Sequence, residues 1–125
     1  MGHDVKYYGK LTPKNPLNEE EIKLFKELKG RRDYDYLYAL EYRNNGYFEN
    51  DNSCEKVYSD SFYSVIEKYV NKLKEGGNDL IDGSYLVSCS EYGIDDEAIV
   101  LVYKNGAFIQ KGITDLVREF VKVDV

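Results

Sequence analysis

The side chains of this sequence that point to a chemistry are carboxylates gathered in two stretches. Residues 33–55 carry six Asp and Glu residues against a single arginine. Residues 79–97 carry six more and no Lys or Arg: Asp79, Asp82, Glu91, Asp95, Asp96 and Glu97. Grouped carboxylates can bind a divalent cation, meet a basic partner, or simply keep a turn in water. Their spacing is not that of an EF-hand loop, so we expect no metal, and the other two alternatives stay open.

Tyrosine is the second unusual feature, because the chain has thirteen Tyr and no Trp. Tyr is favoured in protein interfaces, where one ring supplies contact area and a hydrogen bond at low entropic cost. Tyr92 directly precedes the acidic turn, so we predict a partner-binding surface made of Tyr92 and the six carboxylates of residues 79–97. The alternatives are that the rings lie in the core, or that the Tyr count reflects a coding bias.

Most enzyme classes need residues that this sequence lacks. His3 is the only histidine and lies at the chain end, where a catalytic base is rarely held rigidly. Cys54 and Cys89 do not have metal-ligand spacing. Neither a G-x-G-x-x-G motif nor a P-loop is present. We therefore expect a protein that is not an enzyme and that uses no cofactor.

The net charge of −6 is divided unevenly along the chain. Residues 1–32 carry +3, whereas residues 33–125 carry −9. An acidic body argues against direct binding of nucleic acid, since phosphates are held by cations, and suits a basic protein partner. One cluster of cations would suit a nucleotide ligand, namely Lys29, Arg31 and Arg32. The alternative is that these cations, which lie at the end of a helix, stabilise the negative end of the helix dipole.

The length and composition of the chain predict a single domain over residues 1–125. Hydrophobic residues make up 42% of the chain, which is enough for a packed core. Neither a membrane-spanning apolar run nor an apolar signal region is present, so we expect no membrane contact and a cytoplasmic location.

Two helices are predicted from apolar spacing and from their end signals. The longer one, residues 59–77, organises the chain, with Ser59, Asp60 and Ser61 offering N-cap oxygens and two glycines at its end. Its apolar face consists of Phe62, Val65, Ile66, Tyr69, Val70 and Leu73. The shorter helix begins after Asn18, which forms a capping box with Glu21, and ends at Gly30.

Strands alternate with these helices. They are expected over residues 5–11, 36–43, 47–49, 85–91, 98–103 and 107–111. In residues 36–43 the rings of Tyr36, Tyr38 and Tyr42 would share one face. Asn44-Asn45-Gly46 and Asn105-Gly106 are hairpin turns. A last helix from Thr114 is expected, with a terminal strand as the alternative.

The order β-α-β-β-α-β-β-β-α with short connections indicates an α+β fold with a mainly antiparallel sheet and two or three packed helices. Residues 98–103 are apolar on both faces, which is typical of a central strand whose sheet is covered on both sides. Because three helices do not suffice to cover both faces of such a sheet, a homodimer across one face is a possible assembly.

The string GKLTPKNPLNEEEIKLFKEL, followed later by a second helix and the hairpin GSYLVSCSEYGIDDEAIVLVYKNG, resembles small uncharacterised proteins of bacteriophages and prophages. Compact acidic phage proteins of this size resemble inhibitors of host defence systems, including anti-CRISPR proteins. The resemblance implies an inhibitor, and it assigns a role to no particular residue.

Three functional hypotheses follow. The first is a non-enzymatic inhibitor that binds a bacterial nucleic-acid-handling protein, such as a defence nuclease, through its acidic, Tyr-bearing surface. The second is an immunity protein that neutralises a basic toxin. The third is a phage sponge that binds a nucleotide messenger at Arg31 and Arg32.

Overall fold

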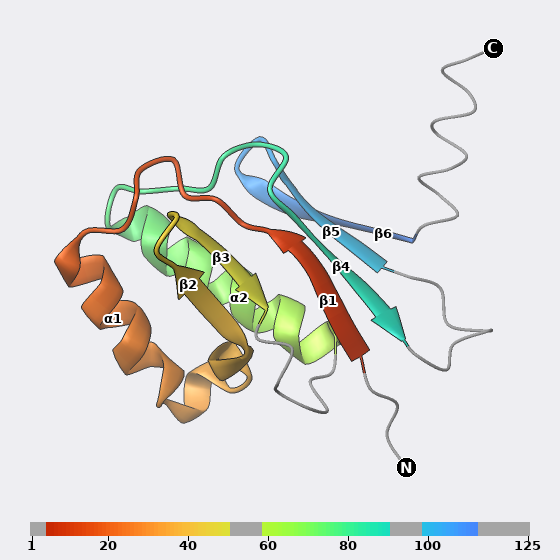
Figure 1. Ribbon diagram of the computed structural model, residues 1–125, viewed down its shortest axis with the longest axis horizontal. Helices are drawn as coiled ribbons and strands as arrows, with labels where there is room; N and C mark the ends of the chain where they lie inside the picture. The colour runs from red at the N-terminus through yellow and green to blue at the C-terminus, as the bar shows by residue number, and fades with distance from the viewer. Residues whose placement is uncertain (1–4, 51–58, 91–98, 113–125) are drawn as a thin grey trace.

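The computed structural model describes residues 5–50, 59–90 and 99–112, which form an α+β fold with antiparallel sheets (Figure 1). The elements in chain order are β1 (Val5–Lys10), α1 (Glu19–Lys29), η1 (Arg32–Tyr34), η2 (Leu37–Ala39), β2 (Leu40–Arg43), β3 (Tyr47–Asn50), α2 (Ser59–Glu75), β4 (Tyr85–Ser90), β5 (Ile99–Lys104) and β6 (Ala107–Gly112). The fold class is as predicted, and so is the order of helices and strands up to β6. The two 3₁₀ turns were not expected, and the predicted C-terminal helix or strand lies outside the described residues.

The strands form a four-stranded sheet in the order β1-β4-β5-β6 and a separate β2-β3 hairpin. All of the pairings are antiparallel. Two backbone hydrogen bonds of 3.0 and 2.7 Å join Leu11 to Phe48, so the hairpin continues the sheet beyond β1. In Figure 1 the strands accordingly follow one another as β2, β3, β1, β4, β5 and β6.

Local signals in the sequence account for the ends of α1. The Asn18 side chain accepts a hydrogen bond from the Glu21 N–H at 2.8 Å, and the Glu21 carboxylate accepts one from the Asn18 N–H at 3.1 Å. This is the predicted capping box, which pairs two N–H groups that have no partner inside the helix. Gly30 caps the other end, and Phe25 and Leu28 are buried on the inner side of α1.

The long helix α2 ends as predicted but begins earlier than its expected cap. Ser59, Asp60 and Ser61 lie in its first turn, so they do not precede it; the N-cap position lies outside the described residues. At the other end the Gly77 N–H donates to Lys74 O at 3.0 Å and the Asn78 N–H donates to Leu73 O at 3.2 Å. This pair of hydrogen bonds is a Schellman motif, and the positive φ of 92° at Gly77 is the backbone conformation that it requires.

The prediction of a strand over residues 36–43 is wrong for its first half. Tyr36 has a φ of 72°, and residues 37–39 form a 3₁₀ turn before β2 begins at Leu40. The alternating tyrosines imitate a strand pattern, but Tyr36 and Tyr38 lie before the strand and do not share a strand face with Tyr42. Packing explains the difference, because Leu37 and Ala39, which would alternate outward in a strand, are fully buried in the core.

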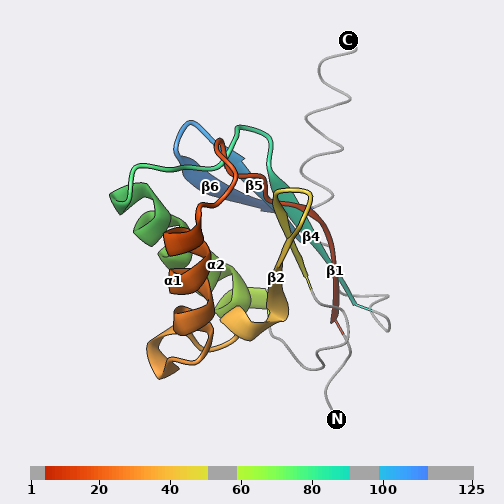
Figure 2. The ribbon, with the colours of Figure 1, turned by 60° about the vertical axis from the view of Figure 1, so that its left-hand side comes forward.

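Both long helices lie on one side of the four-stranded sheet (Figure 2). The rings of Tyr7 on β1 and Phe62 on α2 are 4.7 Å apart, and the Tyr63 hydroxyl donates to Ile99 O at 3.2 Å. The strand β5 is central, as predicted, yet in the described part of the chain helices cover only its inner side. The other side of β5 is the sheet face for which the sequence offered a homodimer as a possible cover.

Candidate binding surface

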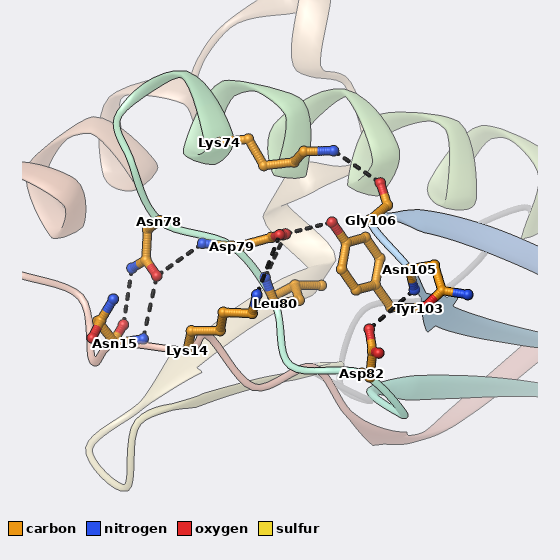
Figure 3. Close-up of polar contacts among 10 residues, drawn as sticks. All are labelled: Lys14, Asn15, Lys74, Asn78, Asp79, Leu80, Asp82, Tyr103, Asn105 and Gly106. Carbon is orange, nitrogen blue, oxygen red and sulfur yellow. Dashed lines mark hydrogen bonds and ion pairs between the residues drawn. The ribbon is translucent and has the colours of Figure 1, made fainter.

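Asp79, one of the predicted partner-binding carboxylates, lies in the connection between α2 and β4. Its carboxylate accepts a hydrogen bond from the Tyr103 hydroxyl and one from the Leu80 N–H at 2.8 Å, and Lys14 Nζ lies 3.9 Å away (Figure 3). The neighbouring Asn78 side chain exchanges two further hydrogen bonds with the backbone of Asn15. The connection thus ties α2, β5 and the segment before α1 together.

The electrostatics of Asp79 agree with this structural role. Burial alone would raise the pKa of its carboxyl group, but the Tyr103 hydroxyl, the Leu80 N–H and two lysines favour the ionised form. The pKa of Asp79 is therefore lowered below its ordinary value. The pKa of Tyr103 moves upward, because its ring is buried and its proton is donated to Asp79. Asp79 consequently holds the fold together, which leaves it poorly placed to meet a partner.

Asp82 is also engaged within the chain. It accepts a hydrogen bond from the Asn105 N–H at 3.0 Å, and Lys74 Nζ donates to Gly106 O at 2.8 Å (Figure 3). Asn105 and Gly106 both have positive φ, as the predicted type I′ turn requires. Asp82 and Lys74 therefore secure the β5–β6 turn from two sides.

The other predicted partner-binding residues lie outside the described part of the chain. They are Glu91, Tyr92, Asp95, Asp96 and Glu97. Their strands, however, are described: β4 and β5 pair up to Ser88 and Ile99, so all five residues lie in one connection between adjacent strands. That connection leaves the sheet at one end, whereas Asp79 and Asp82 lie in the connection at the opposite end of β4.

The predicted cation cluster borders a hollow of about 430 Å³ lined by Lys29, Gly30, Arg31, Arg32 and Asp35. Two of its cations already have carboxylate partners. Arg31 makes two hydrogen bonds, of 2.9 and 2.8 Å, to Asp33, and Lys29 contacts Glu41 at 3.3 Å. An anionic ligand would have to compete with these carboxylates, so the hollow does not favour a nucleotide.

One surface was foreseen only as the face of a homodimer: the side of the four-stranded sheet that faces away from α2. Strand alternation and register place ten described side chains there, and we call this set the outer sheet face: Tyr8, Lys10, Tyr85, Val87, Val100, Val102, Lys104, Ala107, Ile109 and Lys111. Exposed fractions of 55% for Tyr8, 46% for Tyr85 and 40% for Ile109 are large for such side chains. The available signal in the sequence was the alternation of side chains in VKYYGK, which places Tyr8 and Lys10 on one face of a strand. This alternation identifies the outer sheet face only once β1 is known to pair with β4.

The charges of the outer sheet face have a single sign. Its charged members in the described structure are Lys10, Lys104 and Lys111, and it has no carboxylate among them. The described segments as a whole carry 14 basic and 13 acidic side chains, so they are nearly neutral. The negative charge of the chain therefore comes from residues 1–4, 51–58, 91–98 and 113–125. Within residues 33–125, the described segments carry nine acidic and six basic side chains, so this part of the chain is still acidic, although less so than the −9 of the whole stretch.

No group of three or more His, Cys, Asp or Glu residues is placed to hold a metal ion within the described segments. No helix in those segments is both long and apolar enough to cross a membrane.

Comparison with known proteins adds no relative. No protein-family model, no curated protein and no solved structure matches this chain significantly.

Proposed function

We propose that this protein is a non-enzymatic inhibitor that binds a bacterial nucleic-acid-handling protein, as an anti-CRISPR protein does. The acidic connection between β4 and β5 makes the contact. Its carboxylates occupy the Lys and Arg sites of the partner that otherwise hold phosphates, and Tyr92 supplies an aromatic anchor.

One observation carries this proposal: the separation of charge between the sheet and the connection that leaves it. The described segments are nearly neutral, whereas residues 91–98 hold Glu91, Asp95, Asp96 and Glu97 with no Lys or Arg. The pairing of Ser88 with Ile99 confines these carboxylates to a single connection. Local negative charge of this kind attracts a basic groove and speeds association.

The structural roles of Asp79 and Asp82 narrow the proposed surface. Both carboxylates already accept hydrogen bonds from the rest of the fold. The proposed contact therefore consists of Glu91, Tyr92 and residues 95–97, without the two aspartates of the α2–β4 connection.

The test reverses the three adjacent carboxylates, Asp95→Lys, Asp96→Lys and Glu97→Lys, in the full chain. Wild-type and variant proteins are used to capture partners from bacterial lysate at low and high salt, and the captured protein is then titrated against each. We expect the variant to associate more slowly and to bind more weakly, and wild-type binding to weaken as salt rises.

A matched control reverses Glu67 and Glu75, two exposed carboxylates on α2. This variant changes the net charge in the same direction but leaves the β4–β5 connection intact. If the control loses binding while the variant of residues 95–97 keeps it, the surface has been assigned wrongly. If neither variant affects binding, the electrostatic mechanism is refuted.

The identity of the captured protein decides between the two biological settings. A nuclease or other nucleic-acid-handling protein of a defence system supports the inhibitor. A basic toxin would instead make this chain an immunity protein, which uses the same charge complementarity.

A further inference from the structure

We propose that the outer sheet face binds single-stranded nucleic acid, with bases stacked on Tyr8 and Tyr85 and phosphates held by Lys10 and Lys104. This site is separate from the acidic connection and goes beyond the proposed inhibitory function. It differs from the expectation of no direct nucleic-acid contact, which depended on the net negative charge of the chain, because the described charges of this face are positive.

The register of the sheet brings the two rings together. Lys10 is paired with Tyr85, and Tyr8 is paired with Val87, which follows Tyr85 by two residues on the same face of β4. Tyr8 and Tyr85 are therefore diagonal neighbours on adjacent strands, with side chains close enough to serve adjacent nucleotides. Aromatic rings exposed on a flat sheet are a usual platform for unpaired bases.

Gly9 sets the position of the Tyr85 ring. A Cβ atom at Gly9 would lie 2.9 Å from one carbon of that ring and 3.0 Å from another, so the ring lies directly against the glycine backbone. One side of the ring is thereby supported while the residue as a whole remains 46% exposed. A ring held in this way loses little conformational entropy when a base stacks on it.

The lysines stand on different strands around the two rings. Lys10 lies on β1 beside Tyr85, whereas Lys104 lies on β5, on the other side of β4. Lys10 Nζ is also 4.3 Å from the centroid of the Tyr47 ring, which adds an aromatic group beside β1. Phosphates along an extended strand would thus meet only positive charge on the described part of this face.

The charges also decide against two other occupants. A second copy of this chain seated face to face would bring lysines toward lysines, which disfavours that homodimer. An acidic peptide matches the lysines, but it gives the two exposed tyrosines no planar group to stack on. A single strand of nucleic acid satisfies both the charges and the rings.

The test measures binding of fluorescently labelled oligothymidine and oligouridine to the full chain by anisotropy at low salt, with duplex DNA and polyglutamate as competitors. We expect the Tyr8→Ala/Tyr85→Ala variant to bind about tenfold more weakly or worse, since each stacked base contributes strongly. Two phosphate contacts predict a slope of about −1.4 for the logarithm of affinity against the logarithm of salt concentration.

Two matched controls separate this site from general effects. Tyr38→Ala removes an exposed tyrosine that lies outside the sheet, and Lys72→Glu reverses an exposed cation on α2. Both should bind as wild type, whereas Lys10→Glu/Lys104→Glu should lose binding. Circular dichroism of each variant establishes that it is folded.

Several results would overturn the proposal. The first is that neither oligothymidine nor oligouridine binds at low salt. The second is that duplex DNA binds as tightly as the single strands. The third is that the folded Tyr8→Ala/Tyr85→Ala variant binds with the affinity of the wild type. Displacement by polyglutamate with equal effect on wild type and tyrosine variants would show that the face accepts any polyanion, which would also refute it.

Discussion

Two buried tyrosines provide a test in which one chemical change has opposite effects. Tyr69 and Tyr103 are 2% and 1% exposed, and replacement by Phe removes one hydroxyl group from each. The Tyr103 hydroxyl donates to the Asp79 carboxylate. The Tyr69 ring packs against Phe25 and Phe48, and its buried hydroxyl has no hydrogen-bond partner within the described structure.

The expected free energies follow from those environments. A buried polar group without a partner costs about 1–3 kcal/mol, and the upward shift of the Tyr69 pKa reflects the same burial. Tyr69→Phe removes that cost and should stabilise the protein by about 1 kcal/mol after a small loss of packing. Tyr103→Phe loses a hydrogen bond to a charged group, worth about 1.5–3 kcal/mol. Since the Asp79 side chain is 25% exposed, water replaces part of that bond, and we expect a destabilisation of about 1–2 kcal/mol.

The assay is urea unfolding at neutral pH, followed by circular dichroism. The midpoint should rise for Tyr69→Phe and fall for Tyr103→Phe, with an unchanged dependence on urea concentration. A fall of the midpoint in Tyr69→Phe comparable with that of Tyr103→Phe would refute the reasoning, because it would mean that the Tyr69 hydroxyl is hydrogen-bonded in the folded protein.

Three further predictions concern single positions. Gly9→Ala should destabilise the protein by more than about 2 kcal/mol in urea unfolding, because the new Cβ would lie 2.3 Å from Tyr85 O at a φ of 110°. Gly83→Ala, which has a φ of 92° and open space, should cost only the backbone strain of about 1 kcal/mol; equal losses at both sites would contradict the role of the contact. Asp79→Asn should reduce the acid sensitivity of folding. Because the pKa of Asp79 is lowered in the folded protein, its carboxylate stabilises the native state at neutral pH and loses this effect as pH falls below about 4. The urea midpoints of the wild type and of Asp79→Asn should therefore converge in acid. Asn18→Ala removes the cap of α1 and should cost about 1 kcal/mol in the same assay, and an unchanged midpoint would mean that the capping box is not needed.

The features that could be predicted from the sequence are the local ones. The capping box of Asn18 and Glu21, the glycine end of α2 and the Asn105-Gly106 turn all depend on residues within a few positions of one another. Such signals are readable because the geometry they satisfy is set by the nearby backbone.

The features that could not be predicted depend on distant partners. The alternation of residues 36–43 indicated a strand, but burial of Leu37 and Ala39 against the helices favours a 3₁₀ turn there. Asp79 was assigned to a binding surface because its partner Tyr103, 24 residues away, is invisible in the local sequence. The homodimer alternative anticipated an uncovered sheet face, but the side chains that β1 and β4 contribute to it could not be named, since these two strands form one surface only through long-range pairing.

The pairing of β1 with β4 also has a consequence for the order in which the chain folds during synthesis. Val5 pairs with Ser90 and Lys10 with Tyr85, so the first strand emerges from the ribosome long before its partner exists. The β2–β3 hairpin and both helices can form in the meantime from local contacts. Pairing of β1 with β4 must therefore wait until residues 85–90 are synthesised, and until then the edge of β1 that β4 will occupy is open to other strands.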